Sequence, residues 1–271
     1  MSAKFSLLWE LSAREAPGPS FLFGTMHIRD RRAFHGMATV QACVNTCQAL
    51  ALEIDLDEGN TGSDPSALRL PDQTSLRDYL SAQGYSRLQK ILLKAFDFNL
   101  NYFSFLTPMA LMEFISEQIM QKDHHLFLDA FLWEYATARG MATLGIESLE
   151  SQQQLLARIP LDMQLKMLKG LGRNPEHYRA LLNHLVRLYE EGDLPNLYRV
   201  SRKSAGGLRK WMLYDRNAVM ADRLASLLPH QRIFCGVGAA HLWGGKGILR
   251  LLKQKGVKIR PIPLNSSAEK R

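Results

Sequence analysis

Along the chain, short apolar runs alternate with longer stretches in which apolar residues recur every three or four positions. The short runs suit strands, because a brief apolar run bounded by turn residues is typical of a buried strand. The longer stretches suit helices; Leu111, Ile115 and Ile119, for example, fall on one helical face. The pattern predicts strands over residues 5–11, 21–23, 49–56, 142–146, 231–237 and 257–262.

The same spacing predicts helices over residues 37–47, 75–81, 85–95, 108–120, 126–139, 152–158, 161–170, 176–190, 207–228 and 245–255. Strands near both ends with helices between them indicate an α/β fold. The closing segment 231–262 reads strand, helix, strand, which is typical of a βαβ unit and predicts parallel pairing of its strands. We expect a single domain over residues 1–271, with a helical insert at about 73–140.

Composition narrows the class of protein. The chain carries a net charge of +8, which attracts nucleic acid and acidic membranes, but its basic residues are spread out and no nucleic-acid motif accompanies them. We therefore expect no nucleic-acid partner. No stretch approaches the ~20 apolar residues of a membrane span, and the run before Glu10 is too short for a secretion signal, so we expect a cytoplasmic protein.

Two histidines follow predicted strands in the same local setting. The motif G-x-x-H occurs at residues 24–27 and 238–241, and each glycine lets the backbone turn sharply after its strand. Ligands of open α/β sheets bind at the carboxyl ends of strands, where a histidine can bind a metal or move a proton at neutral pH. A hydrogen-bonded turn residue is the alternative for either histidine. The repeated setting favours a shared site containing His27 and His241.

Two glutamates are candidates for the same edge of the sheet. Glu53 interrupts the apolar run 49–56, on the same side as Asp55 if the run is one strand, and Glu147 ends the run 142–146. A buried carboxylate needs a partner or a metal. If the two strands are parallel neighbours, the two carboxylates meet at one edge; a structural ion pair with an arginine is the alternative for each.

A third candidate group lies on the predicted helix 207–228. Arg216 and Asn217 occur there within an otherwise apolar pattern. Both side chains can bind a substrate carboxylate or carbonyl. A solvated helix face is the alternative.

Taken together and in order, five motifs resemble the TraB/GumN family, which includes the TIKI metalloproteases. They are F-L-F-G-T-M-H, A-L-E-I-D, L-G-I-E-S-x-x-x-Q, D-R-N-x-x-M and V-G-A-A-H-L-W-G-G-K-G, and they run from about Leu7 to Ile262. The family's usual Glu-Arg-Asn is Asp215-Arg216-Asn217 here. The resemblance implies a central mixed sheet from two related halves flanked by helices, similar to the erythromycin esterase and ChaN folds.

The resemblance also implies a site and a reaction. His27, Glu53 and His241 would line the site and hold a divalent ion such as Mn²⁺, Co²⁺ or Zn²⁺, and Glu147 would accept the proton of a metal-bound water. Gln152, Arg216 and Asn217 would contact the substrate, a peptide or small molecule with an amide bond.

Two alternatives to this metal-dependent hydrolase remain open. In the first, the enzyme needs no metal, and His27 is the general base oriented by Glu53, as in erythromycin-esterase-like relatives. In the second, the protein is not an enzyme and binds a peptide or another small ligand. The sequence does not determine the substrate or the oligomeric state.

Overall fold

The computed structural model describes residues 5–58 and 68–264. The chain divides into two compact units. The first, which we call the sheet unit, comprises residues 1–61, 122–152 and 185–271; the second, the helical unit, comprises residues 62–121 and 153–184. The named strands all belong to the sheet unit, which confirms the predicted mixed α/β class.

One mixed sheet of six strands forms the centre of the sheet unit, in the order β4-β3-β5-β2-β1-β6. β2, β3, β4 and β5 run parallel, while β1 pairs antiparallel with both β2 and β6. Every residue of β2 and β3 is buried, because helices cover both faces of the sheet. The strands are β1 (Leu8–Ser12), β2 (Ser20–Thr25), β3 (Ala49–Leu52), β4 (Ala142–Gly145), β5 (Ile233–Gly238) and β6 (Lys258–Ile262).

The parallel pairing predicted within the closing segment is wrong. β5 has β3 on one side and β2 on the other, so it has no free edge for β6. The chain instead passes through α12 (Ile248–Gln254) to the outer edge of the sheet, where β6 pairs antiparallel with β1. Leu8 is thereby registered opposite Ile262, and the first and last strands of the chain are neighbours.

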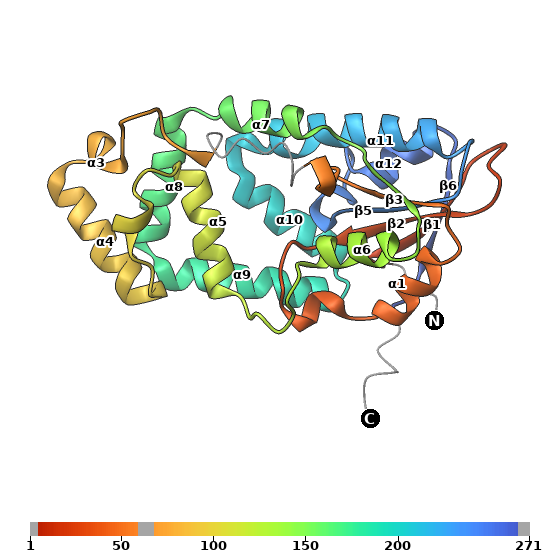
Figure 1. Cartoon of the computed structure of the whole chain (residues 1–271), viewed down its shortest axis with the longest axis horizontal. Coiled ribbons are helices and arrows are strands. Elements are labelled where there is room, and N and C mark those ends of the chain that lie inside the picture. Colours follow the sequence, from red (N-terminus) through yellow and green to blue (C-terminus); the bar gives the residue numbers. More distant parts are fainter. Residues whose placement is uncertain (1–4, 59–67, 265–271) are drawn as a thin grey trace. The chain divides into compact units, whose positions relative to one another are not determined.

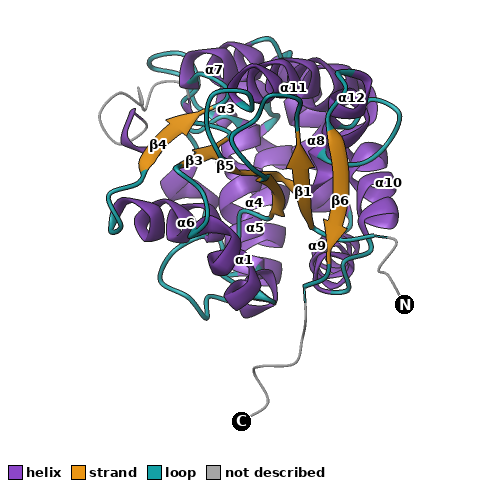
Figure 2. Ribbon diagram, turned by 90° about the vertical axis from the view of Figure 1, so that its right-hand side faces the viewer, coloured by secondary structure: helices purple, strands orange, loops and turns teal. Residues whose placement is uncertain are grey.

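Helices form a layer on each face of the sheet (Figures 1 and 2). α11 (Arg216–Leu227) and α12 cover one face, and α1 (Met37–Val44) and α6 (Leu128–Thr137) cover the other. α10 (Leu194–Ala205), which the apolar spacing did not predict, packs against the short 3-10 turn Ala239–His241.

The helix predicted over 207–228 is not one α-helix. A 3-10 turn at Gly206–Leu208 is followed by a π-helical segment at Lys210–Asp215, and regular α-helix begins at Arg216. π-helical turns are rare and are often found at functional sites. Here the irregular segment ends directly before two of the predicted site residues, Arg216 and Asn217.

The helical unit has its own apolar core, which includes Leu92, Leu111 and Leu168. Its boundaries differ from the predicted insert at 73–140, because Leu128, Leu132 and Ala136 of α6 are fully buried in the core of the sheet unit. The helices with residues in this unit are α3 (Leu76–Tyr79), α4 (Ala82–Phe96), α5 (Pro108–Ile119), α7 (Leu149–Ala157), α8 (Leu161–Arg173) and α9 (Pro175–Glu190). Within the described ranges, none of the helices combines the length and apolarity needed to span a bilayer.

Candidate functional site

Glu53 and Glu147 meet at the carboxyl ends of two neighbouring parallel strands. β3 ends at Leu52 and β4 at Gly145, in register with one another, and the N–H of Glu147 donates to the carbonyl of Glu53 at 2.7 Å. We expected Glu53 to lie inside a strand over residues 49–56, with Asp55 on the same side. This prediction is wrong, because β3 ends at Leu52. The chain bends after Leu52 and crosses over Gly145, where a β-carbon would lie 2.6 Å from the backbone nitrogen of Asp55.

Arg216 joins the two carboxylates. Its Nη2 lies 2.5 Å from Glu53 Oε2 and 2.5 Å from Glu147 Oε2, and its Nε donates to the same Glu147 oxygen at 3.0 Å. Gln152 adds a bond to Glu147 Oε2 from its amide nitrogen at 3.0 Å. The side chains of Arg216 and Glu147 are only 17% and 4% exposed, so this is a largely desolvated ion-pair cluster rather than a surface bridge.

Glu53 is held in its ionised form. Its Oε1 accepts the N–H of Gly238 at 2.7 Å and lies 3.7 Å from His241 Nε2. Burial alone would raise the pKa of Glu53, but the charge of Arg216, that of His241 when protonated, and the bond from Gly238 outweigh it and lower the pKa to about 2.

This shift gives a prediction for acid stability. The pKa of Glu53 is lower in the folded protein than its ordinary value of 4.5, so its stabilising effect is present above pH 4.5 and is lost as the pH falls toward 2. The difference corresponds to about 3 kcal/mol of unfolding free energy. Urea unfolding between pH 5 and pH 2 should show a shallower pH dependence for Glu53→Gln than for the wild type. Parallel pH profiles for the two proteins would contradict the assignment.

His241 is a buried, neutral imidazole with a defined tautomer. The amide nitrogen of Asn217 donates to the carbonyl of Lys246 at 2.7 Å, so the amide oxygen of Asn217 faces His241 Nδ1 at 2.6 Å. Nδ1 must then carry the proton, which leaves a lone pair on Nε2. Burial lowers the pKa of His241. The Nε2 atom lies 3.5 Å from Arg216 Nη1.

The side-chain amide of Asn217 therefore forms its hydrogen bonds with groups of the protein itself. Asn217 is fully buried, and its oxygen and nitrogen both bond to protein groups. The sequence predicted that it binds substrate; in the structure its amide oxygen faces His241 Nδ1 and its amide nitrogen donates to the carbonyl of Lys246.

His27 has different surroundings. Its side chain is 61% exposed, its ring stacks on Phe127 at 4.1 Å between centroids, and its Nδ1 lies 3.4 Å from Asp129 Oδ2. Thr25 donates to the other oxygen of Asp129 at 2.7 Å. Thr25 is also in register with Gly238 on the neighbouring parallel strand, so His27 and His241 follow the same edge of the sheet, as predicted.

Asp129 is a site residue that the sequence reasoning missed. It lies in the first turn of α6, a helix that the sequence placed in the insert. The sequence shows only that Asp129 is an acid near the start of a predicted helix. Acids are common in that position because they stabilise the helix dipole, so it does not indicate a site. Its contacts with Thr25 and His27 span about a hundred positions and have no local signature.

The two motif glycines are required for a reason other than the one predicted. Gly24 and Gly238 have no positive φ, and Gly238 has a φ of −51°. A β-carbon on Gly24 would lie 2.8 Å from a methyl group of Leu242 and 3.1 Å from the Cα of Ala239, and one on Gly238 would lie 3.2 Å from Glu53 Oε1. Both glycines thus allow close packing around the turn that carries His241.

A metal centre made of His27, Glu53 and His241 does not fit these contacts. Across residues 5–58 and 68–264, no group of three His, Cys, Asp or Glu side chains is placed so that it could hold a metal ion. Catalytic zinc sites use three protein ligands. His241 Nε2 and Glu53 Oε1 offer two, and the cation that lies against Glu53 is the guanidinium of Arg216.

Several known proteins are similar to this chain. It is 23% identical to a protein named metalloprotease TIKI2 from Danio rerio, over 95% of this chain and 61% of that protein. It is 23% identical to a metalloprotease TIKI homolog from Amphimedon queenslandica, over 97% of this chain and 62% of that protein. An uncharacterised protein from Treponema pallidum is 21% identical over 94% of this chain and 82% of its own length.

The chain thus spans about three-fifths of the length of the TIKI relatives. No solved structure matches it. The model of the TraB/PrgY/gumN family matches residues 7–261, a range that contains both G-x-x-H motifs, both glutamates and the Asp215-Arg216-Asn217 segment. On the strength of that match over nearly its whole length, the chain belongs to the TraB/PrgY/gumN family.

Proposed function

We propose that this protein is a hydrolase of peptide or amide bonds and that His241 is the general base. The observation that supports this most directly is the arrangement at Nε2 of His241, where a neutral imidazole with a fixed tautomer lies beside an ionised carboxylate and a guanidinium. The names of the TIKI relatives support a peptidase-like reaction.

In the proposed reaction, a water molecule attacks the carbonyl carbon of the substrate while Nε2 of His241 takes the water's proton. Glu53 stabilises the imidazolium that forms, because its Oε1 lies 3.7 Å away. The Nη1 group of Arg216, which lies 3.5 Å from His241 Nε2 and takes no part in the carboxylate bonds described above, donates through its second N–H to the developing oxyanion. The proton then passes to the departing amine nitrogen as the carbon–nitrogen bond breaks.

The other predicted residues take supporting roles in this scheme. Glu147 and Gln152 hold the guanidinium of Arg216 in place, in contrast to the proton-accepting and substrate-binding roles expected from the sequence. His27, which is exposed and paired with Asp129, is a second acid–base group at the same edge and contacts the substrate.

The second candidate is the metal-dependent version of the same hydrolysis, which the names of the TIKI relatives favour. It requires a divalent ion such as Mn²⁺, Co²⁺ or Zn²⁺ and an arrangement in which His27 joins Glu53 and His241 as a ligand. Because the side chains are not placed in that way, we assign no step of the reaction to a metal.

A peptide-library cleavage assay tests both candidates. The protein should cleave a subset of peptides, and His241→Ala should not. Treatment with EDTA should leave cleavage by the metal-free mechanism unchanged, whereas loss of activity on EDTA and recovery with Mn²⁺, Co²⁺ or Zn²⁺ would replace it with the metal-dependent one. Saturable peptide binding without any turnover would overturn the hydrolase proposal in favour of a binding protein.

A substitution of Asn217 tests whether this residue orients His241 or binds the substrate. Asn217→Leu should lower kcat by about 10–100-fold while KM changes little, because the variant loses control of the His241 tautomer without losing a substrate contact. A raised KM with an unchanged kcat would show that Asn217 binds substrate after all. Thermal melting of the variant checks that the loss is not one of folding.

A further inference from the structure

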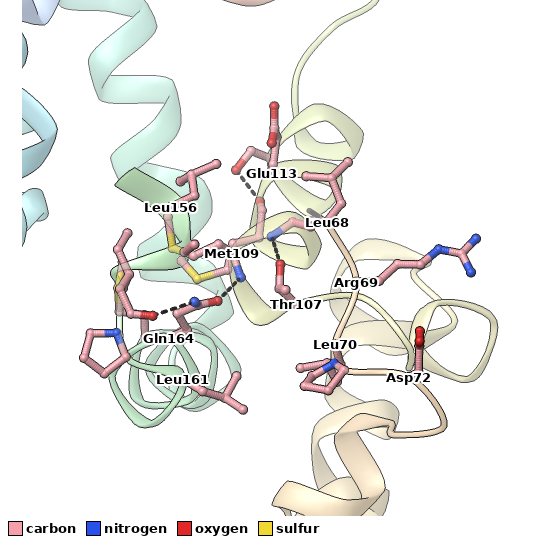
Figure 3. Close-up of a pocket in the computed structure, with 18 of the residues that line it drawn as sticks. Leu68, Arg69, Leu70, Asp72, Thr107, Met109, Glu113, Leu156, Leu161 and Gln164 are labelled. Atoms are coloured by element: carbon pink, nitrogen blue, oxygen red, sulfur yellow. Dashed lines mark hydrogen bonds between the residues drawn. The ribbon is translucent and has the colours of Figure 1, made fainter. Parts of the chain in front are cut away.

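We propose that the helical unit contains a separate binding site for an extended peptide segment that has apolar side chains and at least one basic group. The site is a half-open pocket between α5, α8, the turn that precedes α8, and residues 68–72 (Figure 3). None of the residues assigned to hydrolysis lines it. The inference therefore does not depend on the proposed function.

The wall of this pocket is fixed by a buried side chain. Gln164 is 7% exposed, and its amide nitrogen donates to the carbonyl of Ile159 at 3.0 Å while its oxygen accepts the N–H of Met109. Figure 3 shows Gln164 beside Met109, with Leu68 and Leu70 across the cavity. Because the first turn of α5 is thereby joined to the start of α8, the pocket exists before a ligand arrives, which reduces the ordering cost of binding.

The lining is apolar and adaptable. The cavity has a volume of about 830 Å³, within the range of ligand sites, and three methionines line it: Met109, Met112 and Met167. Methionine side chains are unbranched and polarisable, so they fit apolar side chains of varied shape. Such a surface suits a family of peptide sequences better than one rigid ligand.

The segment Leu68–Leu70 supplies a backbone edge. The N–H of Leu70 and the carbonyl of Leu68 bond to Phe105 and Thr107 on one side, as expected for an antiparallel bridge between Arg69 and Leu106. In that geometry Arg69 presents its own N–H and carbonyl on the opposite edge. An extended peptide can pair with such an edge and place alternate side chains in the pocket.

The charges of the pocket favour a basic peptide over a fatty acid of similar size. Asp72 and Glu113 are the acidic groups of the lining, and Arg69 is the basic one. The guanidinium of Arg69 lies over the ring of Phe105, 4.9 Å from its centre. With two carboxylates against one guanidinium, the lining has an excess of negative charge, which disfavours the carboxylate of a fatty acid and favours a lysine or arginine side chain.

Fluorescence anisotropy with the full-length protein tests the site. The probe is a labelled peptide, Leu-Ala-Leu-Lys-Leu-Lys, and the same titration is made with His241→Ala to exclude cleavage of the probe. We expect saturable binding to both proteins. Absence of saturable binding overturns the proposal, and because the proposed hydrolysis is measured separately by cleavage, the two can fail independently.

Two methionines of α8 provide a matched pair of variants. Met167 lines the pocket, whereas Met163 lies one helical turn earlier, is 36% exposed and is not part of the lining. Met167→Lys should weaken peptide binding at least tenfold, and Met163→Lys should leave it unchanged. Equal effects of the two variants would overturn the placement, and displacement of the peptide by dodecanoate at lower concentrations than by unlabelled peptide would assign the pocket to acyl chains.

Discussion

His241→Ala is expected to lower kcat for peptide or amide hydrolysis by about 10²–10⁴-fold, the usual contribution of a general base. In the proposed mechanism His241 Nε2 is the general base, Asn217 fixes its tautomer through Nδ1, and Glu53 stabilises its charged form. Steady-state cleavage of a library-selected peptide measures the effect. His230→Ala changes an exposed histidine outside the site and should keep the wild-type rate.

The fold should survive this substitution. His241 occupies the end of a short 3-10 turn after β5, and the neighbouring core residues Ala239 and Leu242 are unchanged in the variant. The circular dichroism spectrum should match that of the wild type. Wild-type turnover in a folded His241→Ala protein would refute the assignment of the base, and an unfolded variant would show that the role of His241 is structural.

Arg216→Leu should destabilise the protein by about 3–5 kcal/mol, because it leaves the carboxylates of Glu53 and Glu147 desolvated without their shared cation. Arg216→Lys keeps the positive charge, but an ammonium group cannot bond both carboxylates as the planar guanidinium does. The stability of this variant should therefore lie between those of the wild type and Arg216→Leu. Urea unfolding at pH 7 measures the differences.

A double variant tests the cause of this loss. Adding Glu53→Gln to Arg216→Leu removes one of the stranded charges and should recover part of the lost stability. If the double variant is destabilised by the sum of the two single effects, the ion pair is not the reason for the loss. Activity should be lost in all of these variants except Arg216→Lys, which retains a positive charge near the oxyanion.

Much of this site could be predicted from the sequence because it depends on strand ends. Glu53, Glu147 and His241 each follow a short apolar run, and parallel strands bring their carboxyl ends to one edge. The periodicity of two or of 3.6 residues is a local property, so the strands and most helices could be read from it. The repeated G-x-x-H motif after two predicted strands led to the expectation that His27 and His241 share a site, and the parallel pairing of β2 with β5 places both at the same edge of the sheet.

The partners of these residues could not be predicted, since they depend on packing between distant segments. Asp129 reaches His27 only because α6 packs on the sheet, and α6 was assigned to the insert. Arg216 is the cation at Glu53, in a position where the sequence predicted a metal ion. The π-helical segment before Arg216 also has no sequence signal in an analysis that assumes a constant helical period.

The position of β5 in the sheet has a consequence for biosynthesis. β5 separates β3 from β2, yet its residues come more than two hundred positions after β2, as in the pairing of Phe21 with Phe234. During translation, β2 and β3 therefore lack their shared neighbour β5 until residues 233–238 have left the ribosome. Long-range pairing of this kind slows folding and exposes nascent chains to aggregation. Only when residues 233–262 emerge can the sheet be completed and His241 reach Glu53, so the candidate site forms late in the synthesis of this sheet.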